Sequence, residues 1–136
     1  MRFGTMLAIL LAVGCTACQP RGAAVDAASA GSVRITRIVP DISTTLRVGD
    51  RVDFEVVTEY TLSAESGTLA LVVQTADNSV LANRLEVLSK GTGTVSLKTS
   101  IVVPETTSIA IFTPLAAQGQ TATSIVDTRA IKVIPK

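Results

Sequence analysis

The chain has 136 residues, of which 47% are hydrophobic, 3% aromatic and 17% charged, and its formal net charge is +1. This length predicts one domain, and the balanced charge excludes the strongly basic surface typical of nucleic-acid binding. The sequence has no histidine and no tryptophan, and its two cysteines are Cys15 and Cys18. Most histidine-based catalysis and most metal sites are therefore excluded, and we expect no catalytic residue, no metal site and no cofactor.

Residues 1–14 have the layout of a secretory signal peptide. Arg2 precedes an uncharged, mostly apolar stretch that runs from Phe3 to Val13. At about eleven residues this stretch is shorter than the roughly twenty that a membrane-spanning helix needs. A positive residue followed by a short apolar stretch and small residues is typical of an export signal that is removed from the mature protein. The alternative is a short buried helix, which the position at the initiator methionine disfavours.

The end of this segment carries a more specific pattern. Small or aliphatic residues precede Cys15, in the order Leu11, Ala12, Val13 and Gly14. This order resembles the lipobox of bacterial lipoprotein signal peptides, although Ala12 stands where that family most often has leucine. The resemblance implies that Cys15 is acylated, becomes the mature N-terminus and anchors the protein in the membrane. Cys18 is the alternative lipid attachment site, and it would give a longer signal peptide.

The residue after Cys15 is Thr16. In the sorting rule of enteric lipoproteins an aspartate at this place retains the protein on the inner membrane. The resemblance therefore implies the outer membrane, with the domain facing the periplasm or the cell surface. Cys15 and Cys18 also form a C-x-x-C pair, but no βαβ pattern follows it and the sequence has no second pair. Both absences argue against a redox or zinc motif.

Residues 15–31 are predicted to be a flexible tether that follows the lipidated cysteine. After Cys15 the sequence reads TACQPRGAAVDAASAG, which is small and polar and has no apolar period. A short alanine-rich helix from Ala23 to Ala30 is the alternative.

Residues 32–136 are rich in valine, isoleucine and threonine, and turn residues recur along them, which favours strands over helices. Val33 and Ile35 alternate with polar residues in the first expected strand. The clearest strand is 51–62, whose inward row is Val52, Phe54, Val56, Thr58, Tyr60 and Leu62. Its outward row is Arg51, Asp53, Glu55, Val57, Glu59 and Thr61. This alternation predicts a half-buried strand.

Three turns are expected after this strand, at Ser63–Gly67, Ala76–Ser79 and Ser89–Gly93. Between them we expect a strand with Leu69, Leu71 and Val73 inward. The next, 80–88, is expected to have Leu81, Leu85 and Val87 inward and Arg84 and Glu86 outward. A fifth strand, with Val95, Leu97, Thr99, Ile101 and Val103 inward, should end at Pro104, because proline cannot donate to a ladder.

The sixth expected strand contains Ile109 and Ile111 and closes at Pro114, and Leu115–Thr123 is a loop. The seventh covers 124–134, with Ile131 and Val133 inward. Seven short antiparallel strands without helices predict an all-β, immunoglobulin-like sandwich over residues 32–136. A small closed barrel is the alternative, and it would need another strand from residues 39–47.

Few residues of the sandwich suggest chemistry. Asp53, Glu55 and Glu59 share the outward row, which favours a solvated sheet face over a catalytic carboxylate pair, and Lys98 should lie opposite this row. Ser89-Lys90-Gly91 lacks the strand–loop–helix context of a phosphate loop and predicts a β-turn. Carboxylates and an amide fall near the loops at the end far from the tether: Asp41, Asp50, Asp77, Asn78 and Glu105. These are typical turn residues, and a Ca²⁺ site is the alternative.

Three function classes compete. The leading interpretation is a non-enzymatic, lipid-anchored envelope protein that presents the sandwich as an interaction or structural module. The alternatives are an accessory lipoprotein subunit of a secretion or transport machine, and an enzyme. The expected partners are the membrane, through the lipid anchor, and an unidentified envelope protein. No nucleic acid and no small-molecule substrate is expected, because the chain after the predicted signal peptide has three aromatic residues (Phe54, Tyr60 and Phe112), which are too few for stacking platforms.

Overall fold

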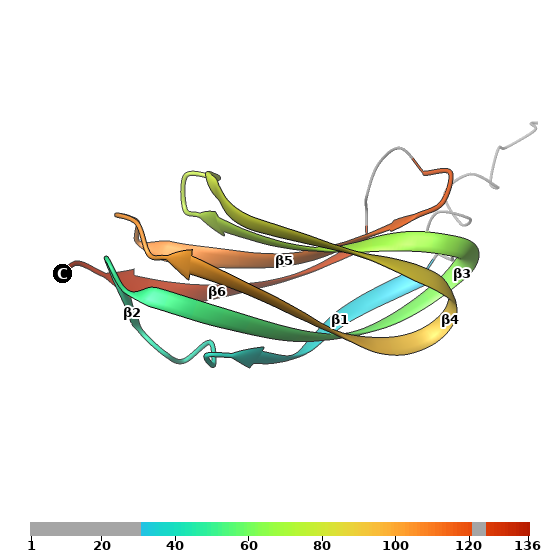
Figure 1. Cartoon of the computed structure of the whole chain (residues 1–136), viewed down its shortest axis with the longest axis horizontal. Helices are drawn as coiled ribbons and strands as arrows, with labels where there is room; N and C mark the ends of the chain where they lie inside the picture. The colour runs from blue at the N-terminus through green and yellow to red at the C-terminus, as the bar shows by residue number, and fades with distance from the viewer. Residues whose placement is uncertain (1–30, 121–124) are drawn as a thin grey trace, which may run out of the picture.

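A computed structural model describes residues 31–120 and 125–136, and their regular structure consists entirely of β-strands (Figure 1). The strands are β1 (Gly31–Val39), β2 (Leu46–Arg47), β3 (Arg51–Thr75), β4 (Val80–Val102), β5 (Ser108–Ala117) and β6 (Ile125–Ile134). The predicted signal peptide, Cys15, Cys18 and all of the predicted tether except Gly31 lie outside the described residues. Gly31 itself begins β1. The described residues contain no helix long and apolar enough to cross a membrane.

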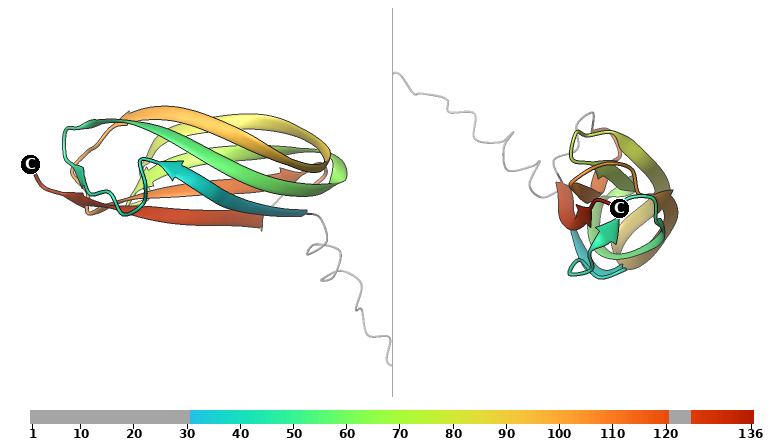
Figure 2. Two further views of the ribbon diagram at one scale, coloured as in Figure 1. Left: turned by 90° about the horizontal axis from the view of Figure 1, so that it is seen from below. Right: turned by 90° about the vertical axis from the view of Figure 1, so that its left-hand side faces the viewer.

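The long hairpin of β3 and β4 forms the frame of the molecule. The two strands pair antiparallel from Arg51↔Val102 to Gln74↔Val80. The other edge of β3 pairs with β1 in its first half and with β5 in its second half, and β5 pairs with β6. Because the hairpin bends halfway, its two halves lie in different layers of a sandwich (Figures 1 and 2). One layer holds β1, and the other holds β5 and β6.

Two of the three predicted turns are wrong. Ser63–Gly67 lies inside β3, and Ser89–Gly93 lies inside β4. The chain does change direction there, but it does so as two paired strands that bend together, with a register irregularity between Leu62 and Ser66. Gly91 lies opposite Leu62 with a φ of 124°, a conformation open to glycine at no steric cost. The small residues therefore permit a bend, and backbone pairing across it keeps both strands continuous.

The strand count changes accordingly. The four strands predicted between residues 51 and 103 are the halves of β3 and β4, and residues 31–120 and 125–136 form a sheet of six strands. Residues 39–47 supply the short β2, whose residues Leu46 and Arg47 pair in parallel with β6. β1 and β4 each pair with β3 alone among the described strands, so no ladder closes a barrel. The predicted antiparallel sandwich is confirmed, and the turn at Ala76–Ser79 is in place, where Thr75 and Ser79 bond across it.

The sequence predicted that the sixth strand closes at Pro114, and this is wrong. β5 continues through Pro114 to Ala117. Pro114 is opposite Val126 of β6, whereas the ladder between β5 and β3 is interrupted around it. Without an N–H group, proline breaks one ladder and leaves the other intact. Pro104, by contrast, follows the end of β4, as predicted.

The core lies between the layers and confirms the predicted phase of several strands. Phe54, Val56 and Leu62 of β3 are buried, and Val57, one residue along, is only half-buried. The second half of β3 and the two following strands supply the rest of the largest buried side chains: Leu69, Leu71, Val73, Ile109, Ile111, Leu115 and Ile131. Leu97, Ile101 and Val103 are also buried, as the alternation in 94–103 predicts.

The predicted phase of 80–88 is confirmed at Leu81, which is half-buried and packs against the core, and is wrong for the rest of the strand. Leu85 and Val87 are 65% and 77% exposed, although both were expected to be inward. Arg84 and Glu86 are the residues on the core-facing side, because they lie opposite the buried Leu71 and Leu69. A bulge at Leu81 shifts the register between Val73↔Ala82 and Gln74↔Val80. Moreover, the strand is at the edge of its layer, where inward positions still reach water.

Among the described residues, one buried side-chain polar atom has no hydrogen-bond partner. The hydroxyl of Thr58 is fully buried and forms no hydrogen bond. A buried hydroxyl in this state has lost its water without compensation, which costs about 1–3 kcal/mol.

We therefore expect Thr58→Val to raise the free energy of unfolding by about 1 kcal/mol, because it removes the hydroxyl and keeps the shape. The matched control is Thr113→Val. Thr113 is equally buried, but its hydroxyl donates to the Asp127 carbonyl at 3.4 Å. Thermal or urea unfolding measures both variants. An equal gain from both would contradict the assignment of Thr58 as the unsatisfied group.

Candidate interaction surfaces

The outer face of the layer with β1 is charged and internally neutralised. The carboxylate row of β3 lies between cations of its two neighbours: Arg34 Nη2 is 3.0 Å from Glu59 Oε2, and Arg37 Nη2 is 3.0 Å from Glu55 Oε1. Lys98 is opposite Glu55 in the register, and its Nζ is 3.9 Å from Glu55 Oε2. The predicted solvated row and the predicted place of Lys98 are both confirmed. We call this surface, formed by β1, the first half of β3 and the second half of β4, the charged face.

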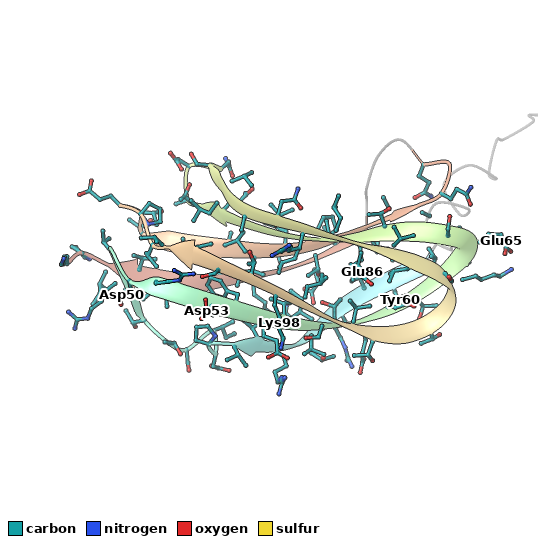
Figure 3. All side chains as sticks on the ribbon, viewed as in Figure 1. Asp50, Asp53, Tyr60, Glu65, Glu86 and Lys98 are labelled. Atoms are coloured by element: carbon teal, nitrogen blue, oxygen red, sulfur yellow. The ribbon has the colours of Figure 1, made fainter. Side chains whose placement is uncertain are left out.

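Figure 3 shows how the labelled charges are distributed, with Asp53 and Lys98 on this layer and Glu65 at the bend. Lys90 does not lie in a turn, as the sequence predicted. It is part of β4, and its Nζ contacts Glu65 Oε1 at 3.2 Å across the bend. Exposed pairs of this kind contribute only about 0–1 kcal/mol each to stability. On the charged face, however, the carboxylates of Glu55 and Glu59 are already paired with cations of this chain.

The outer face of the other layer is almost free of charge. Register pairs place Val72 beside Phe112, Phe112 beside Thr128, and Pro114 beside Val126. The outward positions of its four strands are Asn83, Leu85, Val87, Thr68, Ala70, Val72, Gln74, Ala110, Phe112, Pro114, Ala116, Val126, Thr128 and Ala130. Lys132, opposite Ser108, is the charged residue at one end of this surface. We call it the uncharged face.

The uncharged face has a shallow hollow of about 290 Å³, lined by Val72, Gln74, Phe112, Pro114 and Val126. Val126 is 49% exposed, and Leu85 and Val87 continue the apolar surface to the edge of the layer. Sequence reasoning missed this face. The alternation was considered strand by strand, and the outward positions of neighbouring strands were not considered together.

The side of the sandwich where β1 meets β6 is closed by side chains. The Asp127 Oδ2 atom accepts a hydrogen bond from the Ile35 amide at 2.8 Å, and Arg129 Nη2 donates to the Ile35 carbonyl at 3.4 Å. Asp127 and Arg129 also form an ion pair. The pair therefore satisfies the backbone amide and carbonyl of Ile35 at the edge of β1, and it links the two layers.

The ionisation of Asp127 depends on this arrangement. Burial by itself disfavours the charged carboxylate, but the hydrogen bonds from the Ile35 amide, the Arg129 guanidinium and the Thr128 amide outweigh it, together with the Arg129 charge. The pKa of Asp127 is therefore lowered from its ordinary value. A group with a lowered folded pKa stabilises the protein above its unfolded pKa, and the contribution disappears as the pH falls through the folded value.

Two carboxylates at the end far from Gly31 are occupied by their own turns. Asp41 Oδ1 accepts hydrogen bonds from the Ser43 hydroxyl at 2.7 Å and the Ser43 amide at 2.9 Å, and these bonds lower its pKa. Asp77 accepts from the Thr75 hydroxyl and from Ser79, which lower its pKa in the same way. Among the described residues, no three histidine, cysteine or carboxylate groups gather as a metal site.

Two other hollows are lined by polar groups. One, of about 750 Å³, lies near the start of β1 and is lined in part by Arg34, Glu59, Tyr60, Asp127 and Arg129. The second, of about 530 Å³, is lined by residues of β3 and β4, including Arg84. Its lining includes Glu55 and Lys98, whose charges are already paired with each other.

Comparison with solved structures identifies the architecture. The chain is similar to a CARDB domain from Pyrococcus furiosus that was crystallised in complex with di-metal ions, with 12% identity and a TM-score of 0.52 over 78% of this chain and 94% of that one. It is also similar to part of a glycosyl hydrolase family 2 member from Bacteroides cellulosilyticus, with 10% identity and a TM-score of 0.51 over 76% of this chain and 14% of that one.

A β-glucosidase from Listeria innocua, in complex with glucose, matches over 76% of this chain and 16% of its own, with 15% identity and a TM-score of 0.45. No family model matches the sequence, and no curated protein is significantly similar to it. The first similarity shows the fold: the chain is an immunoglobulin-like β-sandwich. The match to the glycosyl hydrolase family 2 member covers only 14% of that enzyme, so it is a likeness of fold alone.

The pH dependence of stability tests the closure by Asp127. We expect Asp127→Asn to lower the free energy of unfolding by about 1–3 kcal/mol at pH 7, because charge-assisted hydrogen bonds are lost. The deficit should begin to shrink as the pH falls below about 4, the ordinary value for an aspartate in the unfolded chain. It should disappear only below the lowered folded pKa of Asp127, where the wild-type carboxylate also becomes protonated. Urea unfolding between pH 3 and 7 measures it.

The matched control is Asp53→Asn. Asp53 is exposed and has no hydrogen-bond or ion-pair partner in the described part of the chain. We expect the free energy of unfolding of Asp53→Asn to differ little from that of the wild type between pH 3 and 7. A deficit in Asp127→Asn that does not change with pH would contradict the ionic closure of this side.

Proposed function

We propose that this protein is a non-enzymatic, lipid-anchored component of the bacterial envelope, whose sandwich binds another envelope protein through the uncharged face. The contrast between the two outer faces carries the proposal. On one face β3 places carboxylates between cations, and on the other the outward positions are apolar or neutral except for Lys132 at one end. Contiguous apolar surface on a domain is typical of a protein-binding site.

The chemistry of the uncharged face favours a protein as its occupant. The hollow at Val72 and Phe112 is shallow, and small-molecule sites are usually concave with several convergent polar groups. The cation at the end of the uncharged face is Lys132, and a single positive charge is too little to bind a nucleic-acid backbone. A flat, weakly polar sheet surface complements the equally flat surface of a folded partner.

The anchor rests on the resemblance of the first eighteen residues to a lipoprotein signal peptide, with Cys15 as the lipid attachment site and Cys18 as the alternative. Gly31 begins β1 at the same end as the bend of the hairpin, and the C-terminus is at the opposite end (Figures 1 and 2). The residues between Cys15 and Gly31 could extend to about 50 Å. Such a tether would let both faces clear the membrane surface, on the outer membrane as the residue after Cys15 implies.

Intact mass of the protein extracted from membranes tests the anchor. We expect a diacylglyceryl adduct on a chain that starts at Cys15, because several acyl chains, at about 0.8 kcal/mol for each buried CH₂, give stable insertion. A chain that starts at Cys18 would move the site. An unmodified chain that stays in the soluble fraction would contradict the anchoring.

Photo-crosslinking in the envelope of the producing cell tests the working face. A photoreactive residue at Val126, on the uncharged face, is expected to give an adduct with a second, different protein. The matched position is the exposed Thr94 on the charged face, which should give none. Val126→Glu should abolish copurification of that partner at unchanged melting temperature, while Thr94→Glu leaves it intact.

Adducts from Thr94 that equal those from Val126 would contradict the assignment of the face. A partner that copurifies in fixed stoichiometry would identify the chain as an accessory subunit of an envelope machine. That outcome would support the proposed interaction role and would identify the machine to which the protein belongs.

A further inference from the structure

The outer edge of β4 is the longest unpaired strand edge in the described part of the chain. β4 has 23 residues and pairs only with β3 there. The edge of β1 is different, because Asp127 and Arg129 satisfy the backbone of Ile35. A row of free amide and carbonyl groups is a template for another strand.

Apolar side chains are concentrated on this strand. Four of the seven exposed large hydrophobic residues in the described chain lie on β4: Val80, Leu85, Val87 and Val102. Leu85 and Val87 are the most exposed, at 65% and 77%. Their neighbours Arg84 and Glu86 have no hydrogen-bond or ion-pair partner in the described part of the chain. Figure 3 shows Glu86 between the two halves of β4, on the side that faces the other layer.

From these observations we infer that β4 pairs with β4 of a second copy of this chain, antiparallel, about a twofold axis through Leu85. In this register Leu85 lies opposite Leu85 of the second copy. Arg84 then lies opposite Glu86 of the second copy, and Glu86 opposite its Arg84. The sequence Arg84-Leu85-Glu86 is thus complementary to itself, and each unpaired charge obtains a partner.

The neighbouring registers are unfavourable. Partners in an antiparallel twofold pair must both present the same backbone edge, so the axis passes through a residue. An axis through Arg84 would place two arginines opposite each other, and one through Glu86 would place two glutamates opposite each other. Like charges directly opposite are destabilising. The charges therefore select the register centred on Leu85.

The same two charges discriminate against other strands. Charged residues that point inward at an edge normally prevent pairing, because an incoming apolar strand would desolvate them. A second copy escapes this penalty, since it brings the opposite charge to each position. The pairing also covers the apolar Leu85 with its own counterpart.

Cysteine crosslinking of the full chain tests the register. In a background of Cys15→Ser and Cys18→Ser, which removes the native thiols, the protein is purified in mild detergent. Leu85→Cys should crosslink efficiently to a species of twice the mass with a reagent that spans less than about 8 Å, because opposite residues are about 5 Å apart. Asn83→Cys alone and Val87→Cys alone should not crosslink, whereas an equal mixture of the two should, since Asn83 lies opposite Val87.

Charge reversal tests the complementarity. Arg84→Glu alone and Glu86→Arg alone each place like charges opposite each other twice, so the dimer affinity should fall about tenfold. The double variant Arg84→Glu/Glu86→Arg should restore it. Sedimentation measures the affinity, and unchanged circular dichroism and melting temperature confirm that the variants fold.

Three results would overturn the inference. They are the absence of a Leu85→Cys crosslink at concentrations up to millimolar, crosslinking of Asn83→Cys alone as efficient as that of Leu85→Cys, and a double variant no better than the single ones. None of these depends on lipid attachment or on the partner of the uncharged face, so the two proposals fail separately.

Discussion

The pairing of β3 with β4 on both sides of the bend is the constraint on which the rest of the sandwich depends. Because both strands pass from one layer to the other, the layers cannot slide or rotate independently without breaking this ladder. Small residues at the bend make the arrangement possible. A Cβ on Gly67 would lie 2.9 Å from the Ala116 carbonyl oxygen, so glycine also lets β5 approach closely there. The hairpin therefore fixes where β1, β5 and β6 can pack.

The hairpin also decides which edges remain open. One edge of β3 is divided between β1 and β5, and the other is occupied by β4 on both sides of the bend. β4 must then be an edge strand in both layers. On the opposite side the layers approach through β1 and β6, where Asp127 and Arg129 satisfy the backbone. The molecule is thus closed on one side by a polar bridge and open on the other, and the open side is the one that can accept another strand.

Local alternation predicted much of this fold. The inward row of 51–62 and the place of Lys98 opposite the carboxylate row follow from the period of two and from antiparallel pairing alone. The failures have identifiable causes. Glycine and serine at 63–67 and 89–93 suit both a turn and a bend, and only the pairing partner distinguishes them. In 80–88 a bulge at Leu81 and the edge position reverse the expected phase, and neither is visible in the sequence.

The candidate site was harder to predict because it belongs to several strands at once. The uncharged face did leave one signal, since no charged residue occurs between Glu105 and Asp127. Likewise Leu69–Val73 is an unbroken apolar run, so both of its sides are apolar rather than one. A strand of a two-layer sandwich needs only one apolar side for its core. A second apolar side in neighbouring strands therefore indicates a surface that meets something other than water.

The uncharged face and the unpaired edge of β4 lie on the same layer and share residues. Leu85 and Val87 form the margin of the uncharged face and also flank the charges at the edge of β4. Pairing at that edge would place two uncharged faces side by side as one continuous sheet surface. Two copies held in this way would present two binding sites at a fixed spacing, which raises the effective concentration of the second site after the first has bound. A weak contact at each face would then suffice for stable association with an oligomeric partner, which is consistent with a face that is shallow, small and only moderately apolar.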